Sequence, residues 1–132
     1  MARGESLPSL GELEIGVLRL VWEHQPCTER QISDLVVEER SVARTTVLKT
    51  MQRLEAKGLL RRVPGKGPVR FRAALNQRRV LPVLIRRFVK AALGGSPEPL
   101  VAYLADSDKL SLEDLQALQK IAGKLADEPP EP

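Results

Sequence analysis

Apolar residues recur at helical spacing in SLGELEIGVLRLVWEH, residues 9–24. A stripe of this period is typical of an amphipathic helix that buries one face. Ser9 and Glu12 have the spacing of a capping box, in which two side chains satisfy free amides at a helix start. We therefore expect a helix that begins at Ser9 and ends before Pro26. The stripe comprises Leu10, Leu13, Val17, Leu20 and Val21, and is widened by Leu18 and Trp22.

A second capping-box pattern, Thr28 followed by Gln31, opens TERQISDLVVEE. Ile32 and Leu35 give this segment an apolar face, so it predicts a short helix. Its capped start could also present amide groups to a phosphate.

A third helix is expected at about 44–57. Val47, Met51 and Leu54 recur at i, i+4 and i+7 and form its inward face, with Leu48 at the margin. Gly58 follows this helix at the position where a glycine in the left-handed conformation commonly ends a helix.

The period then changes from 3.6 to 2. Residues 60–63 read as one strand, and Val69, Phe71 and Ala73 alternate with two arginines in another. The intervening PGKGP is a turn. Three helices followed by a hairpin predict a winged helix-turn-helix over residues 1–76, so the fold is mainly α with a small β-hairpin wing.

Beyond Asn76, three further helices are expected. The first runs from about Leu81, with Pro82 tolerated in its first turn. Gly94 and Gly95 end it, and Ser96 and Pro97 have the N-cap and N1 positions of the next helix, PEPLVAYLAD. Ser111 caps the last. Its stripe is Leu115, Leu118, Ala122 and Leu125.

These three helices can bury only a small apolar core among themselves. A second copy of the chain is the simplest partner that could cover their apolar faces. We expect residues 77–126 to form a helical dimerisation domain and residues 127–132 a disordered tail. The alternative is a monomer in which the stripes pack on the winged domain. The expected dimer contacts are Leu84, Phe88, Leu100, Tyr103, Leu104, Leu115, Leu118, Ile121 and Leu125; Ile85 and Ala92 share the apolar face of the first helix.

The net charge of +4 hides a strong segregation of charge. Residues 40–90 contain 15 Lys and Arg but only one acid, Glu55, whereas residues 1–39 and 91–132 each contain three basic and eight acidic residues. An ordinary solvent-exposed surface contains positively and negatively charged side chains mixed together. Such a block therefore favours a polyanionic partner.

In a winged helix-turn-helix the third helix can enter the DNA major groove. Threonine, lysine and arginine there suit base edges and phosphates, and the basic wing suits the backbone or minor groove. Other interpretations stay open: Arg53 could pair with Glu55, and Arg61, Arg78, Arg79, Arg86 and Arg87 could be only solvated. The candidate DNA contacts are Thr28, Arg44, Thr45, Thr46, Lys49, Arg53, Arg62, Lys66, Arg70 and Arg72.

Composition argues against an enzyme. Cys27 and His24 are the only residues of their kinds, which leaves no catalytic constellation, no metal site and no cofactor requirement. We interpret Cys27 as a buried or half-buried loop thiol. A single cysteine and the absence of a long apolar run indicate a cytoplasmic protein without membrane insertion.

Two rival functions remain. The basic block alone would also suit a non-specific or RNA-directed nucleic-acid-binding protein, although sequence-specific RNA readers tend to stack bases on aromatic side chains. The only aromatic residue in the wing is Phe71, and the alternation along its strand places Phe71 inward. A winged helix used only for protein contacts would not need the charge excess.

The chain resembles the penicillinase-repressor family of the BlaI/MecI type over about residues 10–126. The motifs that carry the resemblance are LGELEIGVLRLVWE, TTVLKTMQRLEAKGLLRR, a wing ending in FRAAL, and GGSPEPLVAYLADSDKLSLEDLQAL. The resemblance implies a homodimeric repressor that binds a palindromic operator through its winged helix. It places DNA contacts at Thr45, Thr46 and Lys49, with Leu48 where relatives can have a polar residue.

The resemblance also bears on induction. In relatives that govern β-lactam resistance, a sensor metalloprotease in the membrane leads to cleavage at an Asn-Phe bond. The nearest equivalent here is Tyr103-Leu104, without the asparagine. Copper-responsive relatives use a cysteine-rich C-terminal metal site, which a chain with Cys27 alone lacks.

Overall fold

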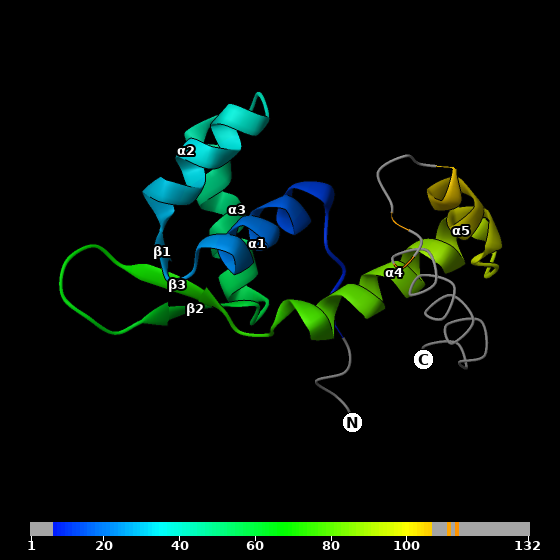
Figure 1. The fold of residues 1–132 in the computed structure, drawn as a ribbon. Helices are drawn as coiled ribbons and strands as arrows, with labels where there is room; N and C mark the ends of the chain where they lie inside the picture. Colours follow the sequence, from blue (N-terminus) through cyan, green and yellow to red (C-terminus); the bar gives the residue numbers. More distant parts are fainter. Residues whose placement is uncertain (1–6, 107–110, 112, 114–132) are drawn as a thin grey trace. The chain divides into compact units, whose positions relative to one another are not determined.

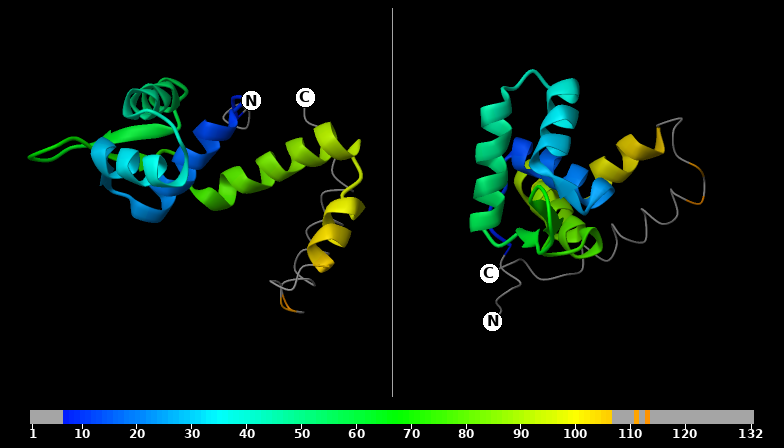
Figure 2. Two further views of the ribbon diagram at one scale, coloured as in Figure 1. Left: turned by 90° about the horizontal axis from the view of Figure 1, so that it is seen from above. Right: turned by 90° about the vertical axis from the view of Figure 1, so that its left-hand side faces the viewer.

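Helices α1 (Glu12–His24), α2 (Glu29–Glu39) and α3 (Arg44–Ala56) pack against one another (Figure 1). The apolar side chains between them are buried. The computed structural model describes residues 7–106, 111 and 113. α2 and α3 lie side by side (Figure 2). Most inward residues predicted from the helical period are buried, and Val17, Val47 and Leu54 are 0% exposed. Leu10, Leu13 and Leu35, which were predicted to face inward too, are only half-buried.

The sheet has the order β1-β3-β2 and is antiparallel throughout. β2 (Leu60–Val63) and β3 (Arg70–Ala73) form the expected hairpin. β1 (Cys27–Thr28) was not predicted, because two residues are too few for alternation to show. It pairs Cys27 with Phe71 and Thr28 with Arg70. Cys27 is therefore buried, as expected, but in a strand and not in a loop.

The start of α1 differs from the expected capping box. Its N-cap is Gly11, not Ser9, and the Gly11 N–H donates to Oε1 of Glu14 at 2.8 Å. Lys57 explains the shift, because its ammonium group bonds both the Glu14 carboxylate and the Ser9 carbonyl. The second capping box is confirmed: the Thr28 N–H donates to Gln31 Oε1, and Thr28 Oγ1 accepts from the Gln31 N–H.

Gly58 ends α3 as predicted, with a φ of +80°. Its N–H donates to the carbonyl of Glu55, and the N–H of Leu59 donates to that of Leu54. These bonds satisfy carbonyls at the helix end and turn the chain into β2.

α4 (Gln77–Leu93) begins earlier than predicted and places Pro82 inside the helix instead of in its first turn. Asn76 explains the early start, because its Oδ1 accepts from the Arg79 N–H at 3.0 Å. The burial of Val80, 1% exposed, also favours helix there. These contacts offset the hydrogen bond that Pro82 cannot donate.

Gly94 and Gly95 end α4 with positive φ, as expected. The N-cap of α5 (Glu98–Ala105) is Pro97, so the predicted cap at Ser96 is wrong by one residue. The last predicted helix, with Leu115, Leu118, Ile121, Ala122 and Leu125, and the tail 127–132 lie outside the described residues.

The chain divides into two compact units, Met1–Val80 and Leu81–Pro132. The winged fold and the sheet belong to the first unit, and α5 belongs to the second. The division falls inside α4.

Candidate nucleic-acid interface

α3 exposes a polar face opposite its buried one. Val47, Thr50, Met51 and Leu54 are at most 2% exposed and turn toward the core. The Thr50 hydroxyl donates to the carbonyl of Thr46 at 2.8 Å, which satisfies it inside the helix. The side chains of the opposite face are exposed and can contact another molecule. This face comprises Arg44, Thr45, Thr46, Leu48, Lys49, Gln52 and Arg53.

Leu48 lies among these polar residues at 39% exposure. An aliphatic side chain at this place can contact the methyl group of thymine but cannot hydrogen-bond a base edge. Lys49, its neighbour in the chain, is exposed and supplies a cation. This face can thus combine apolar and charged contacts.

Arg53 does not pair with Glu55, the partner suggested by the sequence. Glu55 instead accepts from Arg62, at 2.7 Å to Nε and 3.4 Å to Nη2. Arg53 is exposed, and its charge helps to hold the pKa of Glu14 below its ordinary value.

The register of the hairpin separates its arginines by face. Arg61 lies directly opposite Arg72, and Val63 opposite Arg70. Because side chains alternate along a strand, Arg61, Arg70 and Arg72 share one face of the β2–β3 hairpin. Like charges placed opposite one another destabilise a sheet unless an anion lies between them. This face, the arginine face, suits a phosphate backbone.

Arg62 lies on the other face of the hairpin, opposite Phe71. Its guanidinium carbon is 5.5 Å from the centre of the Phe71 ring, and Glu55 supplies the hydrogen bonds that raise the pKa of Arg62. Arg62 thus joins α3 to the sheet. Lys66 is exposed in the turn.

The start of α2 uses its polar groups within the protein. The Thr28 amide and hydroxyl both bond Gln31, at 2.8 and 3.1 Å. The next residue, Glu29, has Oε2 3.8 Å from Nε of Arg44, the first residue of α3. The two helix starts are therefore linked by an ion pair.

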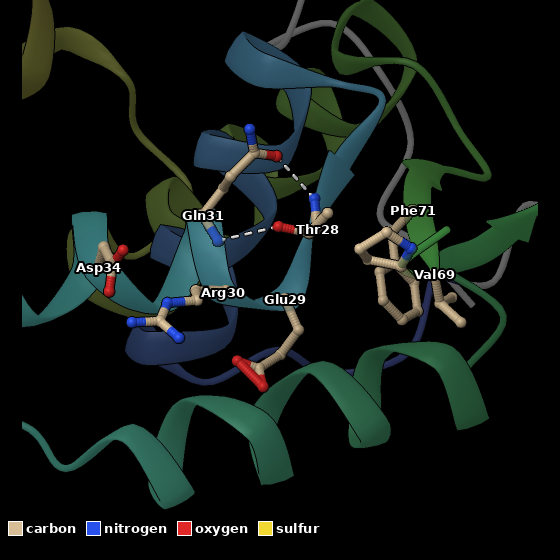
Figure 3. A pocket seen from close by; sticks show the side chains of 8 residues that line it. Thr28, Glu29, Arg30, Gln31, Asp34, Val69 and Phe71 are labelled. Atoms are coloured by element: carbon tan, nitrogen blue, oxygen red, sulfur yellow. Dashed lines mark hydrogen bonds between the residues drawn. The ribbon is translucent and has the colours of Figure 1, made fainter. Parts of the chain in front are cut away.

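An open groove of about 610 Å³ is lined by the start of α2 and by the β2–β3 hairpin (Figure 3). One wall is apolar and belongs to the hairpin, and the other is polar and belongs to α2. The groove is thus continuous with the basic hairpin and the start of α2. Its lining residues are Thr28, Glu29, Arg30, Gln31, Asp34, Pro68, Val69 and Phe71.

The expected dimer contacts that the structure describes belong to α4 and α5. Phe88 and Tyr103 are 51% and 75% exposed, and Leu84, Leu100 and Leu104 are half-buried. Two large apolar or aromatic side chains thus lie open to contact in a single copy of the chain. Tyr103 and Leu104, the candidate cleavage residues, are both within α5.

Cys27 is an unsuitable nucleophile, because burial raises the pKa of its thiol and opposes the thiolate. Among the described residues, no group of three His, Cys, Asp or Glu side chains is placed to hold a metal ion. Within the same ranges, no helix is both long and apolar enough to cross a membrane.

Sequence reasoning gave no indication of Glu29, and it left open whether Arg61 is only solvated. Alternation from the buried Leu60 gives a signal for Arg61, since it places Arg61 and Arg62 on opposite faces. No local pattern connects Glu29 to Arg44, because the two residues belong to different helices.

The sequence model of the penicillinase repressor family matches residues 10–124. This range includes α1, α2, α3, the hairpin, α4 and α5. A comparison with curated proteins finds no match.

Proposed function

The chain belongs to the penicillinase repressor family, whose members are DNA-binding transcriptional repressors, and we propose that it acts as a homodimer on a palindromic operator. α3 would enter the major groove, and the arginine face of the hairpin would contact the adjacent backbone. Two copies would place their α3 helices in grooves about one helical turn apart, or a multiple of it.

The main observation in support of this proposal is that the two sides of α3 differ. One side is buried in the core, and the other exposes cations and hydroxyl groups. Its exposed threonines and Lys49 have the chemistry to meet base edges and phosphates. The charge excess of residues 40–90 supports the same partner.

Dimerisation is supported by the exposed aromatic side chains of the second unit, Phe88 and Tyr103. A surface that pairs with the same surface of a second copy forms a closed, symmetric dimer. The operator would then have the two-fold symmetry of the dimer.

Release by cleavage of the C-terminal unit forms a separate part of the proposal. It is supported by the exposure of Tyr103, which lies in a helix of only eight residues. A protease would need to unwind α5 to reach the Tyr103-Leu104 bond. Mass spectrometry of the chain from induced cells tests this part, and an intact chain after derepression would exclude it.

The test of DNA binding is selection of bound fragments from genomic DNA by the purified protein at about 150 mM salt. Enrichment of a short palindrome is expected. With 6–10 phosphate contacts, affinity should fall roughly 10³–10⁵-fold between 50 and 200 mM salt. Equal binding of bulk DNA or duplex RNA would instead support the non-specific or RNA-directed alternative.

Lys49→Ala should weaken binding to the selected palindrome and leave the dimer intact. Lys90→Ala is the matched control, since Lys90 is also an exposed lysine but lies in the last turn of α4. Equal losses for the two variants would contradict the role of α3.

A further inference from the structure

One oxygen of the Glu29 carboxylate is buried. Oε2 is shielded from solvent and has no hydrogen-bond partner within the described part of the chain, although the side chain as a whole is 24% exposed. The cation beside it is Arg44, with Nε at 3.8 Å. A buried carboxylate oxygen is unfavourable without a compensating charge or donor. The guanidinium of Arg44 supplies that charge.

The pair joins the starts of the two helices that form the helix-turn-helix. Glu29 is the first residue of α2, where the helix dipole favours an anion. Its side chain points toward α3 (Figure 3). Arg44 is the first residue of α3, and residues at the N-terminal end of a recognition helix are those that contact base edges.

Arg44 is 49% exposed, so the pair leaves part of its guanidinium free to contact a ligand. The planar guanidinium has five donors, more than one carboxylate can use. Arg44 can therefore keep its ion pair with Glu29 while it donates to O6 and N7 of guanine, the base with two acceptors in the major groove.

A carboxylate at this place has a cost for DNA binding, because it repels phosphates nearby. Glu29 also partly neutralises Arg44, which weakens any contact of Arg44 with the backbone. An acid here stabilises the start of α2, but it can benefit DNA binding only if it orients the arginine. The pair thus favours base recognition over non-specific attraction.

We propose that Glu29 is a positioning residue that orients the guanidinium of Arg44 for guanine recognition and lowers the affinity for non-specific DNA. This inference rests on the proposed DNA-binding function. It predicts two effects of opposite sign when the charge of Glu29 is removed. A purely structural role would predict neither.

Glu29→Gln tests the proposal with little change in shape. The base that Arg44 reads is first located by selecting duplexes from a random pool with wild-type protein and with Arg44→Ala. The position where only the wild type selects guanine is then replaced by adenine in a second duplex. Dissociation constants for both duplexes and for a scrambled one are measured at about 150 mM salt.

Glu29→Gln should bind the scrambled duplex roughly two- to fivefold more tightly, as expected for the loss of one partly exposed charge. Its preference for guanine over adenine should fall by at least about fivefold, the lower limit for a bidentate pair. In an Arg44→Ala background the same change should leave base preference unaltered, because Glu29 acts through Arg44.

Glu12→Gln is the matched control. Glu12 is an exposed glutamate of α1 that pairs with Arg40 at 3.3 Å, so its replacement removes the same charge without touching α3. It should leave guanine preference unchanged. Glu29→Asp provides a second variant, since it keeps the charge but withdraws the carboxylate. It should lose guanine preference without tighter binding to scrambled DNA.

Unchanged guanine preference in Glu29→Gln would overturn the inference and leave the proposed function standing. Equal weakening on all three duplexes, together with a lower melting temperature, would assign Glu29 a structural role and also overturn it. A wild-type protein with no base preference would remove the proposed function itself, and this inference with it.

Discussion

Nζ of Lys57 lies 2.7 Å from Oε2 and 3.0 Å from Oε1 of Glu14, and this ion pair joins the end of α3 to the first turn of α1. The Glu14 side chain is only 10% exposed, and that of Lys57 is 30% exposed. The same carboxylate accepts from the Gly11 N–H. The pair therefore helps to fix the position of α3 within the winged unit.

Glu14→Gln should lower the free energy of unfolding by about 1–3 kcal/mol, the cost of leaving a mostly buried polar group without its partner. Urea denaturation measures the change. Glu23→Gln is the matched control, because Glu23 pairs with Arg19 on the exposed surface, where such pairs contribute about 0–1 kcal/mol. Equal effects of the two substitutions would contradict a special role for Glu14.

The same pair predicts how stability depends on pH. Burial would raise the pKa of Glu14, but hydrogen bonds from Gly11 and Lys57, with the charges of Lys57 and Arg53, together hold it below the ordinary value of 4.5. The unfolded chain therefore binds this proton before the folded protein does. The stabilisation is present in full above about pH 4.5 and is lost as the pH falls through the lowered pKa.

The difference in free energy of unfolding between wild type and Glu14→Gln should accordingly shrink from pH 7 to pH 4 and continue to shrink below it. Urea denaturation at both pH values measures this difference. A constant difference would mean that Glu14 does not titrate with a lowered pKa.

Arg61→Ala should weaken DNA binding more than Arg62→Ala. Arg61 lies on the arginine face, where its loss should reduce the salt slope by about one. Arg62 is held by Glu55 and covers Phe71, so its replacement should act mainly on stability. Titrations of a labelled duplex between 50 and 200 mM salt compare the two slopes. A larger change in slope for Arg62→Ala would reverse the assignment of faces.

Phe88→Asp should convert the dimer into monomers, because it places a charge on a surface that we propose to bury. Light scattering would measure the mass, and operator affinity should fall roughly 10²-fold or more as the two winged domains lose their linkage. Val37→Asp is the control: Val37 is 49% exposed on α2, close to the 51% of Phe88. A Phe88→Asp protein that stays dimeric would place the interface elsewhere.

Gly58→Ala should destabilise the winged unit by about 1–2 kcal/mol, because Gly58 has a φ of +80°. Apart from Gly58 itself and its two neighbours in the chain, no atom of the described residues lies within 4 Å of an added Cβ, so the effect would be one of backbone strain alone. Gly65→Ala has the same open surroundings without a positive φ and should be close to neutral. Thermal unfolding of the two variants measures the difference. Equal melting temperatures would contradict the prediction that alanine at position 58 strains the backbone.

The helices and the hairpin could be predicted from sequence because their signals are local. The period of 3.6 located the buried side of α3 at Val47, Met51 and Leu54, and the period of 2 located the inward position of Phe71. The helix starts were less predictable. Ser9 and Glu12 match a capping box, yet Glu14 was drawn to Lys57, which is distant in the sequence, and Gly11 became the cap.

By itself, then, the sequence determined which faces are apolar, where the chain turns and where positive charge is concentrated, because each depends on neighbours within one or two turns. Only the tertiary structure decided which charges meet. Register placed Arg61 opposite Arg72 and Arg62 opposite Phe71, and the packing of α2 beside α3 brought Glu29 to Arg44. Such pairs depend on distances between residues that are remote along the chain, and no local period encodes those distances.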